Sequence, residues 1–210
     1  MVSKATLYYI YDPMCSWCWG FKPVWDRVKT ELAERLEIVY VLGGLAPESH
    51  EPMPLEMCES LQQTWRRVSE VCGVAFNFDF WTRNTPMRST YPACKAALVA
   101  REYGKELAMY ERIQRYYYQE AGNPSVYENL YDLAQELDMP RETFAERIHS
   151  PEVDDQLYRE ILFAEQLGAQ GFPSLILKLR DDTHYIQPNY TEVDENIRKI
   201  YGLIDQTELR

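Results

Sequence analysis

The first part of the chain alternates between short apolar runs and one long stretch with apolar residues at helical spacing. Residues 5–11 are mostly aromatic or β-branched and precede an Asp-Pro pair at 12–13, which predicts a buried strand. From Trp17 to Leu36 apolar residues recur every three or four positions and predict a helix with one apolar face. Residues 37–42 form a second apolar run that stops at two glycines, 43–44. This order predicts a βαβ unit with parallel strands.

The middle of the chain, residues 46–168, carries apolar residues at helical spacing almost throughout and predicts an inserted domain made of helices. Its last helix has the clearest limits. Ser150 is predicted to cap the first turn, Pro151 to occupy the first helical position, and Gly168 to end the helix. This helix should lead the chain back to the sheet.

The remaining apolar runs predict a hairpin and one more helix. Residues 174–179 and 184–187 are separated by a charged turn, which favours two antiparallel strands. Thr191 is predicted to cap a final amphipathic helix. The chain therefore reads βαβ, helical insertion, ββα, which is an α/β arrangement. We expect residues 1–45 and 169–210 to form one domain that the helical segment interrupts.

Composition and charge narrow the class of protein. The 210 residues are 46% hydrophobic and 26% charged, as in a packed globular protein. The net charge of -11 argues against nucleic acid or an anionic membrane as a partner, since binding phosphates needs clustered basic residues. No run of about 18 apolar residues occurs, and the first residues lack the pattern of a signal peptide. We expect a cytoplasmic protein.

The pair Cys15 and Cys18 stands between the first predicted strand and the helix that follows it. At a helix start, unpaired backbone N–H groups and the helix dipole favour a negative charge, so Cys15 should be an activated thiolate. Sites of this spacing lower the thiol pKa to about 3.5–7.5. Cys18, one turn inside the helix, is placed to resolve a mixed disulfide. We interpret the pair as the catalytic residues of a dithiol site.

Other uses of cysteine are less well supported. A structural zinc site needs a second pair of ligands, and the other three cysteines stand singly with no histidine close by, so we expect no bound metal. Cys94 begins a predicted helix. It is either a third redox thiol or a small buried core residue, and core packing is the commoner case.

A second motif, residues 171–174 (Gly-Phe-Pro-Ser), lies directly before an apolar strand. Together the two motifs resemble the DsbA family of thioredoxin-fold proteins, in the FrnE-like branch related to 2-hydroxychromene-2-carboxylate isomerase. Residues 12–21 resemble its active-site segment and residues 167–175 its cis-proline loop, and the helical insertion stands where the family carries one. The resemblance implies a thioredoxin fold with a large all-helical insertion between the second strand and the cis-proline strand. It also implies thiol-disulfide oxidoreductase activity of the reductase or isomerase type.

The same resemblance implies roles for residues around the cysteines. Pro173 would be cis and pack beside Cys15, and the backbone of Phe172 would pair with an extended substrate. Without the resemblance, Pro173 could simply open an edge strand. Ser16 and Trp17 stand where strongly oxidising periplasmic members have Pro-His, so we expect a less oxidising pair. Both residues are also predicted to contact the substrate. The predicted partners are protein or small-molecule disulfides.

Two neighbouring residues and two alternative functions remain open. Trp19 could belong to an apolar platform for substrate. Asp12 could modulate Cys18 or relay a proton, or it could only start the turn with Pro13.

A glutathione-dependent isomerase or transferase would use Ser16 or one cysteine, with glutathione as co-substrate and no other cofactor. A non-catalytic binding module would use the cysteines as a redox switch. The oligomeric state does not follow from the sequence.

Overall fold

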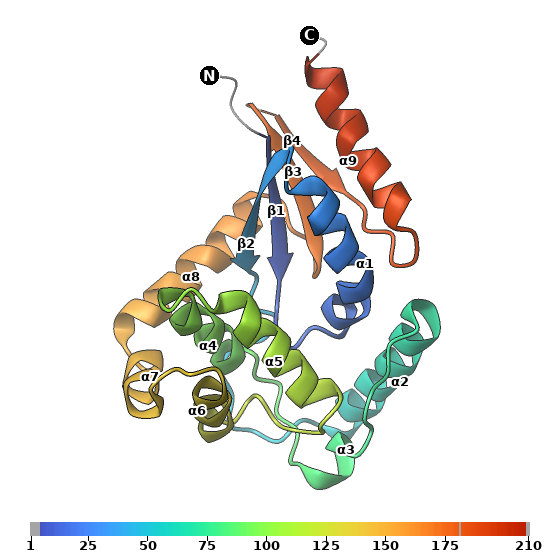
Figure 1. The fold of residues 1–210 in the computed structure, drawn as a ribbon. Coiled ribbons are helices and arrows are strands. Elements are labelled where there is room, and N and C mark those ends of the chain that lie inside the picture. Colours follow the sequence, from blue (N-terminus) through green and yellow to red (C-terminus); the bar gives the residue numbers. More distant parts are fainter. Residues whose placement is uncertain (1–4, 181, 209–210) are drawn as a thin grey trace.

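One mixed sheet forms the centre of the molecule. The computed structural model describes residues 5–180 and 182–208, and within them four strands pair in the order β2-β1-β3-β4. They are β1 Ala5–Tyr11, β2 Leu36–Leu42, β3 Ser174–Leu179 and β4 Asp182–Ile186. Strands β1 and β2 run parallel, whereas β3 is antiparallel to both β1 and β4. The βαβ unit and the hairpin are therefore confirmed, and Figure 1 shows β1 and β2 pointing the same way.

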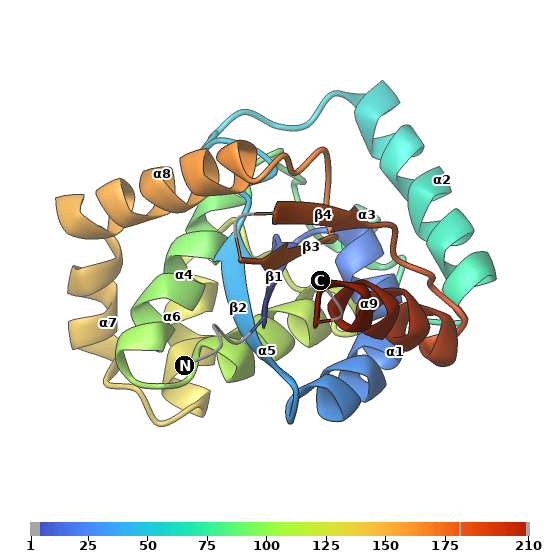
Figure 2. The ribbon, with the colours of Figure 1, turned by 90° about the horizontal axis from the view of Figure 1, so that it is seen from above.

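Helices cover both faces of this sheet. Helices α1 (Ser16–Leu32) and α9 (Val193–Glu208) lie on one face and α8 (Pro151–Gln166) lies on the other, as Figure 2 shows. Alternation along β1 divides its side chains between the two layers, because successive residues of a strand point to opposite faces. Tyr9 stacks on Trp25 of α1 at 4.4 Å between ring centroids, whereas Ile10 packs with Ala164 of α8.

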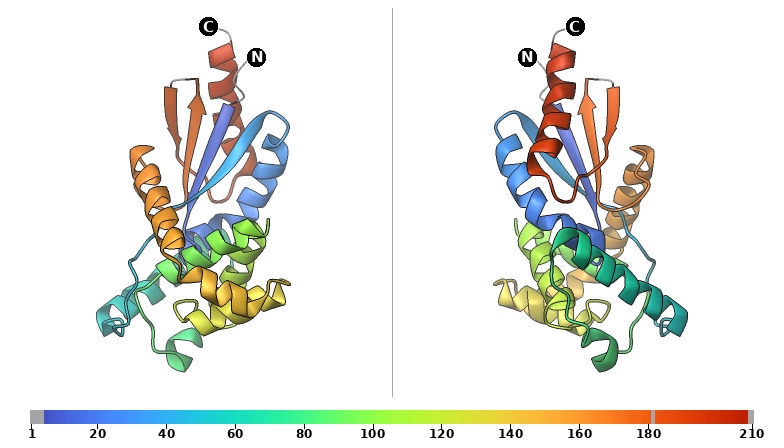
Figure 3. Two further views of the ribbon diagram at one scale, coloured as in Figure 1. Left: turned by 90° about the vertical axis from the view of Figure 1, so that its left-hand side faces the viewer. Right: turned by 90° about the vertical axis from the view of Figure 1, so that its right-hand side faces the viewer.

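The segment between β2 and β3 is helical, as the sequence predicts. Its helices are α2 Leu55–Cys72, α3 Phe80–Arg83, α4 Tyr91–Glu102, α5 Glu106–Tyr118, α6 Tyr127–Glu136, α7 Arg141–Ile148 and then α8. Helices α2 to α7 lie beyond the C-terminal ends of β1 and β2 (Figures 1 and 3). The thioredoxin-like fold with a helical insertion is thereby confirmed. The division into domains at residues 46 and 168 stays a prediction.

A half-buried charge cluster fixes the insertion to the ends of the strands. Arg101 of α4 pairs with Glu106 of α5 and with Glu160 of α8. Glu106 also accepts a hydrogen bond from the Tyr11 hydroxyl at 2.9 Å, and Glu160 accepts one from the backbone N–H of Leu42 at 2.8 Å. Both carboxylates thus face the guanidinium and one strand end each, which orients the helices against β1 and β2.

Two predicted boundaries are wrong for physical reasons. The helix predicted to reach Leu36 ends at Leu32, and Leu36 instead opens β2, paired with Ala5. Leu36 continues the helical spacing of apolar residues, but a buried strand position accepts the same side chain. The last strand begins at Asp182 rather than His184, because Asp182 pairs with Leu179 at the end of β3.

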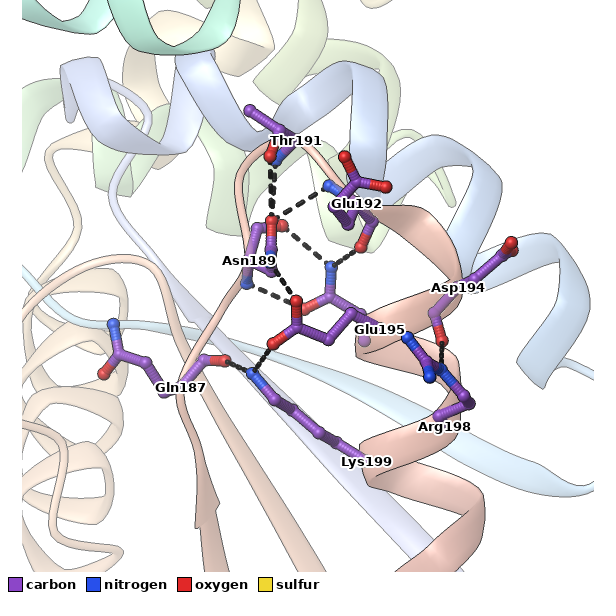
Figure 4. A network of polar contacts seen from close by, with 9 residues as sticks. Gln187, Asn189, Thr191, Glu192, Asp194, Glu195, Arg198 and Lys199 are labelled. Atoms are coloured by element: carbon purple, nitrogen blue, oxygen red, sulfur yellow. Dashed lines mark hydrogen bonds and ion pairs between the residues drawn. The ribbon is translucent and has the colours of Figure 1, made fainter.

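The end of α8 and the start of α9 also differ in detail. Helix α8 ends at Gln166 with Leu167 as its C-cap, and the predicted Gly168 follows with φ 86°. The α9 start depends on Asn189 rather than Thr191 (Figure 4). The Asn189 side-chain oxygen accepts hydrogen bonds from the backbone N–H groups of Thr191 and Glu192 at 3.0 and 2.9 Å. An Asx turn therefore organises this helix start.

Candidate active site

Cys15 stands at the junction of β1 and α1. It is the N-cap of α1 with extended backbone, and its N–H donates to the carbonyl of Asp12 at 3.0 Å. Its carbonyl accepts the N–H of Trp19 at 3.1 Å, the first bond of the helix. The Cys15 side chain is only 6% exposed. A thiolate at this position would face the N-terminal end of α1, where the helix dipole stabilises negative charge.

The loop before β3 faces the Cys15 sulfur. The bond between Phe172 and Pro173 is cis, as predicted, and the Cys15 Sγ donates to the carbonyl of Phe172 at 3.3 Å. The Phe172 ring lies directly over Gly43, where an added Cβ would stand 1.8 Å from a ring carbon. Ser174 ties the loop together through a hydroxyl hydrogen bond to the carbonyl of Gly171 at 2.7 Å. Glycine at 43 is therefore required for the Phe172 ring to lie where it does.

Cys18 lies one turn inside α1 and has no exposed surface. Burial raises the pKa of its thiol well above the usual range, and the adjacent Cys15 raises it further. Cys15 and Cys18 both carry free thiols and are not bonded to each other. The geometry gives one thiol at the edge of the site and a second, protonated thiol behind it.

The residues around the pair fall into an outer and an inner group. Ser16 and Trp17 are half-buried, and Trp17 meets Tyr190 edge to face at 5.0 Å. Trp19 is buried instead, with its indole N–H donating to the carbonyl of Ala75 at 3.1 Å. Trp19 thus joins α1 to the insertion, while Ser16 and Trp17 keep part of their surface exposed beside Cys15.

Asp12 is fully buried behind the motif. One of its carboxylate oxygens accepts the N–H of Met14 at 2.8 Å. The other accepts the N–H of Leu45 and the hydroxyl of Thr90, both at 2.7 Å, and the Cys94 thiol at 3.4 Å. Burial raises the pKa of Asp12, and these hydrogen bonds partly oppose the shift. The carboxylate joins the active-site turn, the loop after β2 and the start of α4.

Cys94 shares this buried environment. It has no exposed surface, and burial together with the nearby Asp12 raises the pKa of its thiol well above the usual range. A protonated, shielded thiol is a poor nucleophile. The geometry therefore favours the core-packing interpretation of Cys94 over a third redox thiol.

Tyr118 is not among the site residues that the sequence predicts. This residue lies in a run of three tyrosines, and its side chain is fully buried with the hydroxyl donating to the carbonyl of Met14 at 2.7 Å. Its ring also stacks on Trp19 at 5.8 Å. Tyr118 supports the active-site turn from the insertion. The tyrosine run alone gave no sign of this, since the contact joins residues about a hundred positions apart.

Within residues 5–180 and 182–208, no three His, Cys, Asp or Glu side chains are grouped so that they could hold a metal ion. None of the helices described there has the length and apolar character needed to cross a bilayer.

Replacing Thr90 with valine should destabilise the site without changing its shape. The Thr90 hydroxyl donates to Asp12 and accepts the backbone N–H of Ala46 at 3.0 Å. Thr90→Val leaves that buried N–H unpaired and should lower the free energy of unfolding by about 1–3 kcal/mol. Urea denaturation measures the change. The exposed Thr143→Val is the matched control, and equal stability of the two variants would contradict the assigned contacts.

A family model matches most of the chain, including the segments that contain Cys15, Cys18 and Pro173. The model for the DSBA-like thioredoxin domain matches residues 6–190. The chain belongs to this family. The predicted membership in the DsbA family is therefore confirmed, and the match spans the helical insertion as well as the strands of this DsbA-like chain. The family comprises oxidoreductases and isomerases of the thioredoxin fold.

Several solved structures share this DsbA-like fold. A candidate protein disulfide isomerase from Nitrosomonas europaea is 28% identical, with a TM-score of 0.84 over 97% of this chain and 98% of that one. The cytosolic disulfide reductase DsbM from Pseudomonas aeruginosa is 25% identical, with a TM-score of 0.77 over 98% and 100%. A second structure of DsbM contains GSH. At 14% identity, 2-hydroxychromene-2-carboxylate isomerase shares the fold alone, with a TM-score of 0.64 over 97% and 95%.

A curated relative is more distant. The ClpXP adapter protein SpxH from Halalkalibacterium halodurans is 19% identical over 176 residues, which are 81% of this chain. The DsbA-like chain matches only 57% of the length of that relative.

Proposed function

We propose that this chain is a thiol-disulfide oxidoreductase of the reductase or isomerase type, with Cys15 as nucleophile and Cys18 as resolving thiol. The observation that carries the proposal is the Cys15 Sγ, held 3.3 Å from the carbonyl of Phe172 at the start of α1. A substrate sulfur that approaches Cys15 passes the same loop, whose backbone is suited to pair with an extended segment. Membership in the DsbA-like family supports the same chemistry.

The reaction runs in two exchange steps. The Cys15 thiolate attacks one sulfur of the substrate disulfide, which forms a mixed disulfide and releases the other sulfur as a thiolate. Cys18 then attacks Cys15, gives up its proton, and releases the second substrate thiol. The product on the enzyme is the Cys15–Cys18 disulfide. The two electrons that reduce the substrate disulfide come from the thiols of Cys15 and Cys18. An external dithiol or two glutathione molecules would reduce the enzyme again.

The substrates we propose are protein or small-molecule disulfides, and the compartment is the cytoplasm. Two observations support this choice. The related DsbM is a cytosolic disulfide reductase, and the chain between the cysteines lacks a histidine that would stabilise a strongly oxidising pair. In a reducing compartment the pair would stand mostly as dithiols, which suits reduction and isomerisation.

Cys18→Ser tests the assigned order of the thiols. Without a resolving thiol, the first exchange should proceed and the second should stop, so the variant should accumulate a mixed disulfide on Cys15 after reaction with glutathione disulfide. Intact-protein mass spectrometry detects the added glutathione, and peptide mapping locates it. The wild type should instead release glutathione and form the internal disulfide. A stable adduct on another cysteine would contradict the assignment.

A glutathione-dependent isomerase is the second candidate, favoured by the GSH found in one DsbM structure and by the half-buried Ser16 beside Cys15. In that mechanism the site holds a glutathione thiolate and needs no second thiol. The same Cys18→Ser variant separates the two functions. It should lose disulfide turnover if the dithiol proposal holds, and it should retain glutathione-dependent activity if the isomerase function holds.

A further inference from the structure

A groove lies beside the cis-proline loop, on the side of the sheet that α8 covers. Its walls come from the loop after β2, the start of α4, and the end of α8 with the loop that follows it. Most of the lining is apolar, with side chains from Leu45, Tyr91, Ile161, Ala164, Ala169 and Phe172. The groove has a volume of about 400 Å³, which is within the usual range for binding pockets. It is therefore large enough to receive part of another molecule.

Two glycines at the end of β2 leave the space that forms the groove. Gly43 lies under the Phe172 ring, as described above. Gly44 has a φ of 62°, a conformation that glycine adopts without strain. A Cβ added at Gly44 would stand 2.4 Å from the end of the Ile161 side chain and 3.0 Å from the Tyr91 ring. A side chain at either position would press on the walls of the groove.

Phe172 joins this groove to the reactive thiol. Its carbonyl accepts the hydrogen bond from the Cys15 Sγ at 3.3 Å, and its side chain lines the groove. Residues 169–172 all line the groove, one after another along the loop. An extended chain advances about 3.3 Å per residue, so a substrate that is bonded to Cys15 and paired along this loop enters the groove within about two or three residues. The groove is thus reached by the segment next to the substrate cysteine.

The charge of the groove disfavours an acidic occupant. Among the described residues that line it, Glu165 is the one with a charged side chain, and it is exposed to solvent. The whole chain also carries a net charge of -11. A carboxylate placed in the groove would be repelled by Glu165. Glutathione has two carboxylates and no apolar side chain, so it matches neither the lining nor the charge.

We propose that this groove is a subsite for an apolar side chain of a protein disulfide substrate, close in sequence to the cysteine that Cys15 attacks. The inference rests on the proposed dithiol function and narrows its substrate class. Apolar side chains are mostly buried in folded proteins, so the substrate is a protein that is unfolded around its disulfide. Burial of the apolar side chain stabilises the complex in which the first exchange takes place. The groove residues contact the substrate side chain and take no part in the exchange itself.

Three activated peptides test this subsite. Each has one cysteine held as a 2-pyridyl disulfide, with leucine, serine or aspartate two positions before and two positions after it. The Cys15 thiolate attacks the peptide sulfur and releases 2-thiopyridone, which takes a proton from solvent and is followed by its absorbance. Cys18 then bonds to Cys15, and its proton ends on the released peptide thiol. The reduced full chain is used, and the rate measured for Cys15→Ser is subtracted.

The wild type should react about tenfold faster with the leucine peptide than with the serine peptide, because only leucine buries apolar surface in the groove. Ile161→Ser should lower this ratio of rates about threefold, since it removes an apolar wall. Leu162→Ser is the matched control and should keep the wild-type ratio, because Leu162 is also half-buried on α8 but lies outside the lining of the groove.

Glu165→Lys changes an exposed residue and tests the charge of the groove. It should raise the rate with the aspartate peptide about threefold relative to the serine peptide, and about 1 M salt should remove the difference. Asp155→Lys makes the same change of charge about 15 Å away along α8 and should have no such effect.

The outcomes separate the subsite from the proposed function. Equal wild-type rates with the leucine and serine peptides, or a ratio that Ile161→Ser leaves unchanged, would overturn the subsite while dithiol chemistry stands. A wild-type preference for the aspartate peptide would overturn it as well. If the wild type forms no Cys15–Cys18 disulfide with any of the three peptides, as read by peptide mass spectrometry, the proposed function is wrong instead.

Discussion

Cys15→Ser should reduce the rate at which the chain catalyses insulin reduction by dithiothreitol to the uncatalysed background, a loss of about a thousandfold or more. Serine keeps the size of the side chain but replaces a thiol, which ionises readily, by a hydroxyl, which does not at neutral pH. The buried Cys18 cannot take over the attack, since it has no exposed surface. The turbidity of the precipitating insulin chain follows the reaction.

Cys58→Ser is the matched control for this loss. Cys58 lies on α2, is half-buried, and donates only a weak hydrogen bond to the carbonyl of Met53 at 3.7 Å. Its replacement should leave the rate within about twofold of wild type. Substantial activity in Cys15→Ser would place the nucleophile elsewhere and refute the assignment of the site.

Gly43→Ala should lower the second-order rate constant for insulin reduction about tenfold or more, although residue 43 carries no chemistry. An added methyl group would stand 1.8 Å from the Phe172 ring, so the ring must move. The backbone carbonyl of Phe172 accepts the hydrogen bond from the Cys15 thiol. A displacement of reacting groups by about 1 Å can lower a rate about a hundredfold. The insulin assay measures the change.

Gly202→Ala provides the comparison for this substitution. Gly202 lies in α9, and a methyl group added there meets nothing within 4 Å. This variant should keep wild-type activity, and alanine should favour its helix slightly. Wild-type activity in Gly43→Ala would show that the cis-proline loop tolerates displacement and would remove Phe172 from the account of substrate binding.

Local features of the fold followed well from the sequence. The first strand, the helix after the Cys15–Cys18 pair and the hairpin are each specified by residues within a short segment, so their patterns were visible along the chain. The cis bond at Pro173 followed from the family resemblance rather than from physical reasoning, because the same motif could open an edge strand.

Boundaries and long-range contacts were less predictable. Leu36 satisfies both helical spacing and a buried strand position, and only pairing with Ala5 decides between them. The support of the active-site turn by Tyr118 depends on a contact between residues far apart in the sequence. The spacing of apolar residues indicates which face of a helix or strand a residue occupies. It does not indicate which residues contact that face.

The central claim is that Cys15 and Cys18 form a reversible disulfide during the reaction. The most direct test is to equilibrate the protein across a series of reduced and oxidised glutathione ratios, alkylate the free thiols, and identify the paired cysteines by peptide mass spectrometry. The account predicts one internal disulfide that joins Cys15 to Cys18 with a defined midpoint, while Cys94 stays reduced. Persistent free thiols at every ratio, or glutathione held on Cys15 with Cys18 unmodified, would contradict it.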